Sequence, residues 1–214
     1  LEGKPLLYYA IQKLKNHGVT SIIVNTHHFS ELIINYIKGN DFGISIEISD
    51  ETTLLLNTGG GLQNARWFFD NNEPFLVYNV DILSDIDLTT MISYHKRSQA
   101  LATLAVMKRH TSRYFLFDGE MNLCGWRNKK DNVEIVVKNS HVLNEFAFSG
   151  IQIINPEYFD KVTFEGVFPI VDVYLDLAKK NMIKGFNHSE TIWCDFGKLH
   201  ELDNATAIVK SVFQ

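Results

Sequence analysis

This 214-residue sequence has only two cysteines, no long apolar run and no excess of basic residues. Its two cysteines, Cys124 and Cys194, form neither a disulfide framework nor a metal-ligand spacing, so a reduced, cytoplasmic setting is expected. No apolar run approaches the roughly 20 residues that cross a membrane. The net charge of −5 argues against a general nucleic-acid surface, which would need a basic patch. No linker, low-complexity segment or repeat divides the chain, which predicts a single domain over residues 1–214.

What the sequence does contain is an alternation of helix and strand patterns. Helices are predicted with Pro5 as the first helical residue, with Ser30 as a cap, and over 88–98. They alternate with strands over 21–26, 44–48, 74–83 and 101–107. This alternation is typical of βαβ units. The fold class expected is therefore α/β, with three layers and a mostly parallel Rossmann-like sheet.

Residues 108–140 depart from this alternation. Three short segments, Tyr114–Phe117, Leu123–Trp126 and Val133–Val137, are separated by turn residues and predict antiparallel hairpins beside the parallel sheet. The alternation then resumes with strands near 146–154, 182–186 and 191–197. An amphipathic helix is predicted through Leu199, Leu202, Ala205 and Ile208.

Carboxylates close two of the short apolar segments. The segment 74–83 carries Asp81 near its end, and the segment 191–197 carries Asp195. Ligands collect outside the carboxyl ends of strands in open α/β sheets. Asp81 is therefore either a metal or ribose ligand or the polar start of a turn, and the segment alone supports both readings equally. The pair His27-His28 has no third metal ligand nearby, which favours an ordinary polar strand end.

The glycine run Gly59-Gly60-Gly61 lies between an apolar segment and a predicted helix. Glycine lets backbone N–H groups approach a ligand and adopt positive φ, and a helix N-terminus favours anions. The alternative is a flexible turn. Alone the run is a weak signal, which the strand ending in Asp81 some twenty residues later strengthens.

Five segments, taken together, resemble the sugar-1-phosphate nucleotidylyltransferases of the GT-A-like α/β fold. They are Gly3-Lys4-Pro5-Leu6-Leu7, Thr58–Gly61, Asn79-Val80-Asp81-Ile82, Phe148-Ser149-Gly150-Ile151 and Trp193-Cys194-Asp195-Phe196-Gly197-Lys198. Their order and spacing span nearly the whole chain. The resemblance is closest to the bacterial branch that activates N-acetylmuramate-, mannose- or heptose-1-phosphate for the cell envelope.

The resemblance implies roles for particular residues. Asp81 and Asp195 would be the catalytic pair that jointly holds Mg²⁺. The nucleotide would contact four residues: Gly59, Gly60, Gly61 and Asn79. The sugar side would involve three: Ser149, Gly150 and, as a nearby candidate only, Lys138.

The sequence also departs from the family pattern. Val80 stands where the family usually has glycine before the metal-binding aspartate. The family's Glu-Lys-Pro on the sugar side has no match, and Glu134 and Lys138 are only nearby candidates. The N-terminal loop Gly-x-Gly-Thr-Arg…Pro-Lys-Pro, which supplies phosphate-binding backbone and catalytic basic residues in the family, is absent. Because the chain opens on Leu1 rather than methionine, we expect part of the domain upstream.

The reaction expected is NTP plus sugar-1-phosphate giving NDP-sugar and pyrophosphate. Such a displacement at phosphorus needs positioning and charge neutralisation more than a strong base. Two alternatives stay open, a GT-A glycosyltransferase that uses a nucleotide sugar and a non-catalytic nucleotide- or sugar-binding module. The partners expected are the two substrates, with no nucleic acid or membrane, and a homo-oligomer is left open.

Overall fold

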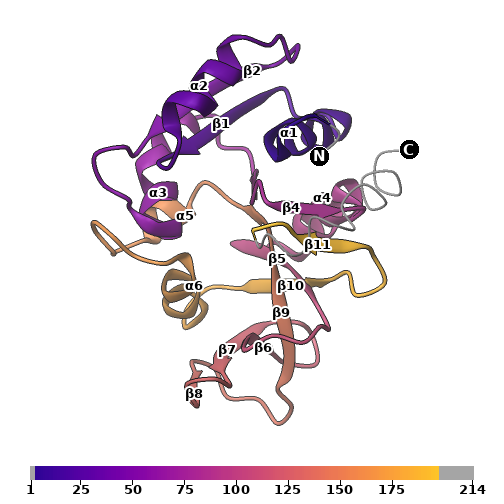
Figure 1. Cartoon of the computed structure of the whole chain (residues 1–214). Coiled ribbons are helices and arrows are strands. Elements are labelled where there is room, and N and C mark those ends of the chain that lie inside the picture. Colours follow the sequence, from indigo (N-terminus) through magenta and orange to yellow (C-terminus); the bar gives the residue numbers. More distant parts are fainter. Residues whose placement is uncertain (1–2, 198–214) are drawn as a thin grey trace.

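The computed structural model of the chain describes residues 3–197, in which helices and strands alternate (Figure 1). The helices, including the 3-10 helix η1, are α1 (Leu6–Asn16), α2 (Ser30–Lys38), α3 (Asn57–Asn64), η1 (Ala65–Phe68), α4 (Leu88–Ser98), α5 (Tyr158–Lys161) and α6 (Ile170–Ala178). The strands are β1 (Ser21–Thr26), β2 (Ser45–Asp50), β3 (Phe75–Tyr78), β4 (Ile82–Ser84), β5 (Ala102–Met107), β6 (Arg113–Phe117), β7 (Leu123–Asn128), β8 (Val133–Val136), β9 (Asn144–Ile154), β10 (Ile183–Asn187) and β11 (Trp193–Asp195). The helix predicted through Leu199 and Ile208 lies outside the described residues. Within residues 3–197 no helix has the length and apolar content to cross a membrane.

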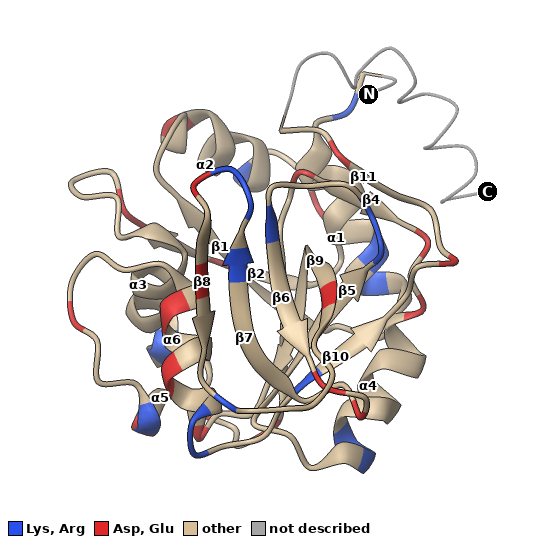
Figure 2. Cartoon of the chain, turned by 90° about the horizontal axis from the view of Figure 1, so that it is seen from below, with Lys and Arg blue, Asp and Glu red and all other residues tan. Residues whose placement is uncertain are grey.

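A seven-stranded sheet forms the centre of the molecule (Figure 2). Its order is β10-β5-β9-β6-β7-β8, with β3 paired to β9 as well. β10 runs parallel to β5, whereas β3 and β5 both pair antiparallel with β9. β3, β5 and β10 therefore share one direction, and β9 runs against them. The α/β class predicted from the sequence is confirmed, with β9 as an antiparallel strand between β3 and β5.

β9 joins the two parts of this sheet. One of its edges pairs with β5, and the other pairs with β6 through residues 144–146 and with β3 through residues 151–154. Between these two pairings lies Gly150, whose φ of +74° is a left-handed conformation that favours glycine. The predicted antiparallel segments are observed as β6, β7 and β8, which extend the same sheet.

Two smaller sheets complete the fold. β1 and β2 form a parallel pair of their own, and β4 pairs antiparallel with β11. The β4–β11 pair joins segments that are far apart in the sequence. Its register places Asp195 opposite Ile82, the residue that follows Asp81.

Helices cover both faces of the main sheet. Tyr174 of α6 packs in one core with Leu104 of β5, and Met91 of α4 packs in a second core with Ala105. Neighbouring residues of β5 thus face different cores, as expected for a strand with a side-chain period of two. The result is the predicted arrangement of three layers.

Local sequence signals predicted some helix boundaries correctly and others incorrectly. α4 occupies the predicted range 88–98, and the side chain of Asp87 caps it. The predicted cap at Ser30 is wrong: Ser30 is the first residue of α2, and Phe29 precedes it in a left-handed conformation with a φ of 56°. Pro5 is the N-cap of α1 rather than its first helical residue.

Candidate active site

The structure brings Asp81 and Asp195 together. The backbone N–H of Phe196 donates a 2.8 Å hydrogen bond to the Asp81 carbonyl, which ties the two segments beside the carboxylates. A Cβ placed on Gly197 would lie 3.0 Å from a carboxylate oxygen of each aspartate. Both side chains therefore converge on the space above Gly197, as the sequence predicted. Asp81 follows β3 by three residues, so it lies in the turn between β3 and β4 rather than in the strand.

The electrostatics of this pair favour a bound cation. Burial, and then the nearby charge of Asp195, raise the pKa of Asp81. A carboxyl group whose ionised form is disfavoured by burial and by a neighbouring carboxylate is stabilised by a cation placed beside it. Oxygen ligands of this kind suit Mg²⁺, which usually keeps several sites for water and phosphate. Among residues 3–197, no group of three or more His, Cys, Asp or Glu side chains is placed so that it could hold a metal ion.

The glycine run does not form the loop that the sequence suggested. Gly59, Gly60 and Gly61 lie inside α3, and none of them has a positive φ. The N–H groups of Gly59 and Gly60 donate to the Phe168 carbonyl at 3.0 and 3.2 Å. A Cβ on Gly60 would lie 2.4 Å from the Gly166 carbonyl oxygen. The expected positive φ is therefore wrong, and Gly59 and Gly60 serve the close packing of α3 against residues 166–168.

Gly61 faces a different, polar environment. A Cβ there would lie 2.6 Å from Oε1 of Glu51 and 2.8 Å from Nδ2 of Asn25. Oε2 of the buried Glu51 accepts a 3.0 Å hydrogen bond from the Leu56 N–H, while its Oε1 has no partner. Buried carboxylate oxygens normally accept a hydrogen bond, so this oxygen could accept one from a ligand. Of the three glycines, Gly61 is thus the one beside a polar group that a ligand donor could satisfy.

Asn79 and Gly150 form one unit next to the aspartates. The Asn79 N–H donates a 2.9 Å hydrogen bond to the Gly150 carbonyl. Its side-chain amide nitrogen would lie 2.9 Å from a Cβ on Gly150. Glycine at this point therefore admits the Asn79 side chain. The structure thus places the predicted residues Asn79 and Gly150 close together. Asn79 lies two residues before Asp81 in the sequence.

Ser149 is placed differently from what its predicted role requires. Its side chain is fully buried, and its hydroxyl lies 2.7 Å from Nε2 of His188. Nδ1 of His188 lies 2.7 Å from the Thr191 hydroxyl, and the Ser149 carbonyl accepts from Nε1 of Trp193 at 2.9 Å. Burial is the main cause that lowers the pKa of His188 to about 4, so its ring is neutral at physiological pH. Ser149 therefore joins β9 to the segment before Asp195 rather than exposing its hydroxyl.

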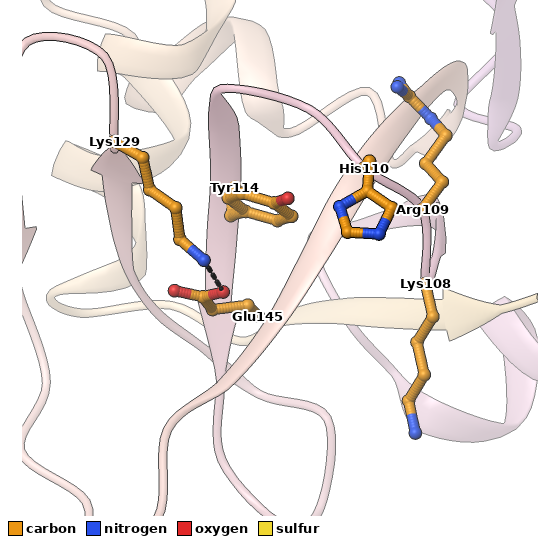
Figure 3. A pocket seen from close by; sticks show the side chains of 6 residues that line it. All are labelled: Lys108, Arg109, His110, Tyr114, Lys129 and Glu145. Atoms are coloured by element: carbon orange, nitrogen blue, oxygen red, sulfur yellow. Dashed lines mark hydrogen bonds and ion pairs between the residues drawn. The ribbon is translucent and has the colours of Figure 1, made fainter.

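A pocket that sequence reasoning missed lies near this region (Figure 3). Its lining residues come from the β5–β6 connection and from β6, β7–β8 and β9: Lys108, Arg109, His110, Tyr114, Lys129 and Glu145. Lys129 pairs with Glu145 at 2.6 Å and lies over the Tyr114 ring at 4.7 Å. The one visible signal in the sequence is the basic run 108–110 directly after β5. Lys138, the candidate named from the sequence, does not line the pocket and donates instead to the Asn181 carbonyl at 3.1 Å.

Arg109 connects the pocket with the aspartate pair. Its guanidinium lies 4.2 Å from the centroid of the Trp193 ring, and one of its terminal nitrogens donates to the Phe148 carbonyl at 2.9 Å. Burial lowers the pKa of Arg109, and the negative charge of Asp195 opposes that shift. Asp195 is thus close enough to influence the guanidinium.

Comparison with known sequences gives consistent results. A family model described as nucleotidyl transferase matches residues 1–211. An N-acetylmuramate alpha-1-phosphate uridylyltransferase of Neisseria meningitidis is 28% identical in an alignment 215 positions long, which covers 96% of this chain and 85% of that protein. A UTP–glucose-1-phosphate uridylyltransferase of Synechocystis is 28% identical in an alignment 217 positions long, which covers 92% of this chain but 53% of that protein. The chain thus spans most of the first relative and about half of the second.

Solved structures share the fold. HddC from Yersinia pseudotuberculosis, crystallised with GMP-PN, superimposes with a TM-score of 0.74 at 19% identity over 98% of this chain and 86% of that one. A UDP-glucose pyrophosphorylase complexed with UDP-glucose gives a TM-score of 0.74 at 17% identity over 97% and 88% of the two chains. At these identities the likeness establishes the architecture.

Proposed function

This chain belongs to the nucleotidyl transferase family, and we propose that it transfers a nucleotidyl group from an NTP to a sugar-1-phosphate, giving an NDP-sugar and pyrophosphate. The observation that carries this proposal is the convergence of Asp81 and Asp195 above Gly197. The relatives named as uridylyltransferases of N-acetylmuramate-1-phosphate and glucose-1-phosphate support the substrate class.

Asp81 and Asp195 are the residues that we propose hold a divalent ion, with Mg²⁺ as the natural choice for two carboxylates. When bound, such an ion neutralises phosphate charge and orients the reacting groups. The protein fixes the two ligands through the β4–β11 pairing and the Phe196–Asp81 hydrogen bond. Rigid placement of this kind suits a displacement at phosphorus, in which positioning and electrostatics supply most of the rate.

The sugar phosphate brings its own nucleophile, because a phosphomonoester oxygen is already ionised near neutral pH. No side chain therefore has to remove a proton, and the neutral, internally bonded His188 is not required as a base. We assign Asn79 and Gly61 to the nucleotide side and Gly150 to the boundary between nucleotide and sugar. We assign Gly59, Gly60 and Ser149 a structural role, in which they hold these segments in place.

A pyrophosphate-release assay tests the proposal. The purified full-length protein would be mixed with Mg²⁺ and each of UTP, GTP, CTP and TTP, together with a panel of sugar-1-phosphates. Glucose-6-phosphate serves as a matched control, since it has the same charge with the phosphate at the wrong carbon. We expect pyrophosphate release that requires both an NTP and a 1-phosphate. Release of a nucleoside diphosphate from a nucleotide sugar would instead indicate a glycosyltransferase, and binding without turnover a non-catalytic module.

The cellular setting belongs to the same proposal. Both substrates are cytoplasmic metabolites. We therefore place the protein in the cytoplasm, where it would supply activated sugars to the cell envelope.

A further inference from the structure

Arg109 lies on the same side of the molecule as the aspartate pair. Trp193 and Asp195 are two residues apart in β11, and residues at this spacing in a strand point to one face. The guanidinium of Arg109 lies over the Trp193 ring, so it occupies the face that carries the Asp195 carboxylate. Its bond to the Phe148 carbonyl holds it beside the Ser149–Gly150 segment.

Arg109 has no ion-pair partner among the described residues, although Asp195 lies close enough to act on its charge. Its Nε is buried without a hydrogen-bond partner among residues 3–197. Arg127, near the same pocket, shows the contrast, because it pairs with both Glu134 and Glu145. Burying part of a cation without a paired anion costs free energy, so such a group is suited to a negatively charged ligand.

The position of Arg109 indicates which anion it would meet. Arg109 lines the pocket together with Tyr114, Lys129 and Glu145 (Figure 3). Its guanidinium lies over Trp193, two residues before Asp195. A sugar phosphate bound here would place its phosphate near Arg109 and its ring in the pocket. Guanidinium groups match phosphate oxygens with two parallel N–H donors.

We propose that Arg109 binds the phosphate of the sugar-1-phosphate, using Trp193 as the platform that fixes its guanidinium. This assignment rests on the proposed function for the identity of the ligand. The competing explanation is that Arg109 is a structural strut, which stabilises β11 through Trp193 and touches no substrate.

Arg109→Met separates the two explanations, because methionine keeps apolar contact with the Trp193 ring but removes the charge and the donors. Arg113→Met is the matched control: it makes the same chemical change at an exposed position of β6 outside the pocket lining. Binding of inorganic phosphate and of a sugar-1-phosphate would be titrated calorimetrically, without turnover. We expect Arg109→Met to weaken sugar-1-phosphate binding roughly 10- to 100-fold, with NTP affinity unchanged and Arg113→Met equal to wild type.

Arg109→Lys extends the test in case the methionine variant is unstable. Lysine keeps the charge but loses the planar fork, so an intermediate loss of sugar-1-phosphate affinity is expected. Wild-type affinity in both Arg109 variants, with a lowered thermal midpoint, would overturn the assignment in favour of the strut. Failure of the proposed function is distinguishable: it would abolish pyrophosphate release with every substrate pair, while the direct titration would still report whether Arg109 binds phosphate.

Discussion

Asp195 accepts a 2.9 Å hydrogen bond from the Gly197 N–H as well as facing Asp81. Asp195→Asn keeps the volume and the accepting oxygen but removes one negative charge. We expect turnover to fall roughly 100-fold or more, with a raised Mg²⁺ requirement, because a hard cation prefers charged oxygen ligands. Pyrophosphate release across a Mg²⁺ titration measures both effects.

Asp87→Asn is the control for that substitution. Asp87 caps α4 by accepting from the Thr90 N–H at 3.0 Å, and asparagine and aspartate rank together as caps. The control should therefore retain turnover and thermal midpoint. If Asp195→Asn behaved like Asp87→Asn, Asp195 would be no more than a turn residue.

His188 makes stability depend on pH in a definite direction. Its pKa is about 4 in the folded protein and about 6.5 in an unfolded chain, so the unfolded state binds more protons between these values. The contribution of His188 to the free energy of unfolding is therefore complete above pH 6.5. It is lost as the pH falls toward 4, by on the order of 1–3 kcal/mol. His188→Gln should flatten that loss, as measured by urea unfolding at pH 7 and pH 4.5. His141→Gln, at an exposed position, should leave the wild-type slope; an unchanged slope in His188→Gln would contradict this account.

At the scale of secondary-structure elements, the structure of α3 changes the effect that we expect from a substitution of Gly60. The resemblance implies that Gly60 contacts the nucleotide, and on that basis a substitution there would weaken nucleotide binding more than folding. A Cβ there meets the Gly166 carbonyl at 2.4 Å, which backbone movement alone can relieve. We now expect Gly60→Ala to lower the free energy of unfolding by roughly 1–3 kcal/mol, with nucleotide affinity retained below the unfolding transition.

Gly119→Ala provides the comparison for Gly60→Ala. A Cβ on Gly119, in the β6–β7 turn, meets no atom within 4 Å. Alanine there should be neutral or slightly stabilising, because it restricts the unfolded chain. Thermal unfolding and nucleotide titration of both variants decide the matter. A stable Gly60→Ala protein that had lost nucleotide affinity would restore the ligand-cradle interpretation.

Elements set by local signals could be predicted, and elements set by distant partners could not. α4 has a cap and an apolar face within its own sequence, and its bounds were predicted correctly. Three glycines suggested a loop because glycine is a poor helix former, yet all three lie in α3, where Gly59 and Gly60 donate hydrogen bonds to the Phe168 carbonyl. The segment 146–154 was predicted to be a strand, but its antiparallel pairing with β3 and β5 was not predicted, because a strand's own sequence carries no information about a partner's direction.

The same distinction applies to the site. Asp81 and Asp195 were predicted because each closes a short apolar segment, although their roles in metal binding and catalysis stay predictions. Arg109 and His188 were not singled out. Their significance comes from contacts with Trp193 and Ser149, which lie in distant parts of the sequence. A lone arginine or histidine offers no local pattern from which such contacts follow.

At the scale of the whole molecule, the three sheets should differ in stability. β5, β9 and β6 belong to one seven-stranded sheet with cores on both faces, whereas β1 and β2 pair only with each other among the described strands. Two-stranded sheets are marginal by themselves. In native-state hydrogen exchange, we expect amides of β1 and β2 to exchange through a lower-energy opening than those of β5 and β9.

The β6–β7 amides test the single-domain prediction in the same experiment. Because β6 pairs directly with β9, its amides should share the slow exchange of β5. Faster, independent opening of β6 and β7 would show that the antiparallel segment is a separate cooperative unit.

Gly197 limits the substitutions that the site can accept. Its missing side chain leaves the space on which both carboxylates converge, and even a methyl group would lie 3.0 Å from each. Every amino-acid replacement reachable from a glycine codon by one base change adds a side chain. A lineage that lost this glycine would have to shift one or both carboxylates away from the point on which they converge. We therefore expect sequence variation among the residues that line the pocket and little variation at Gly197.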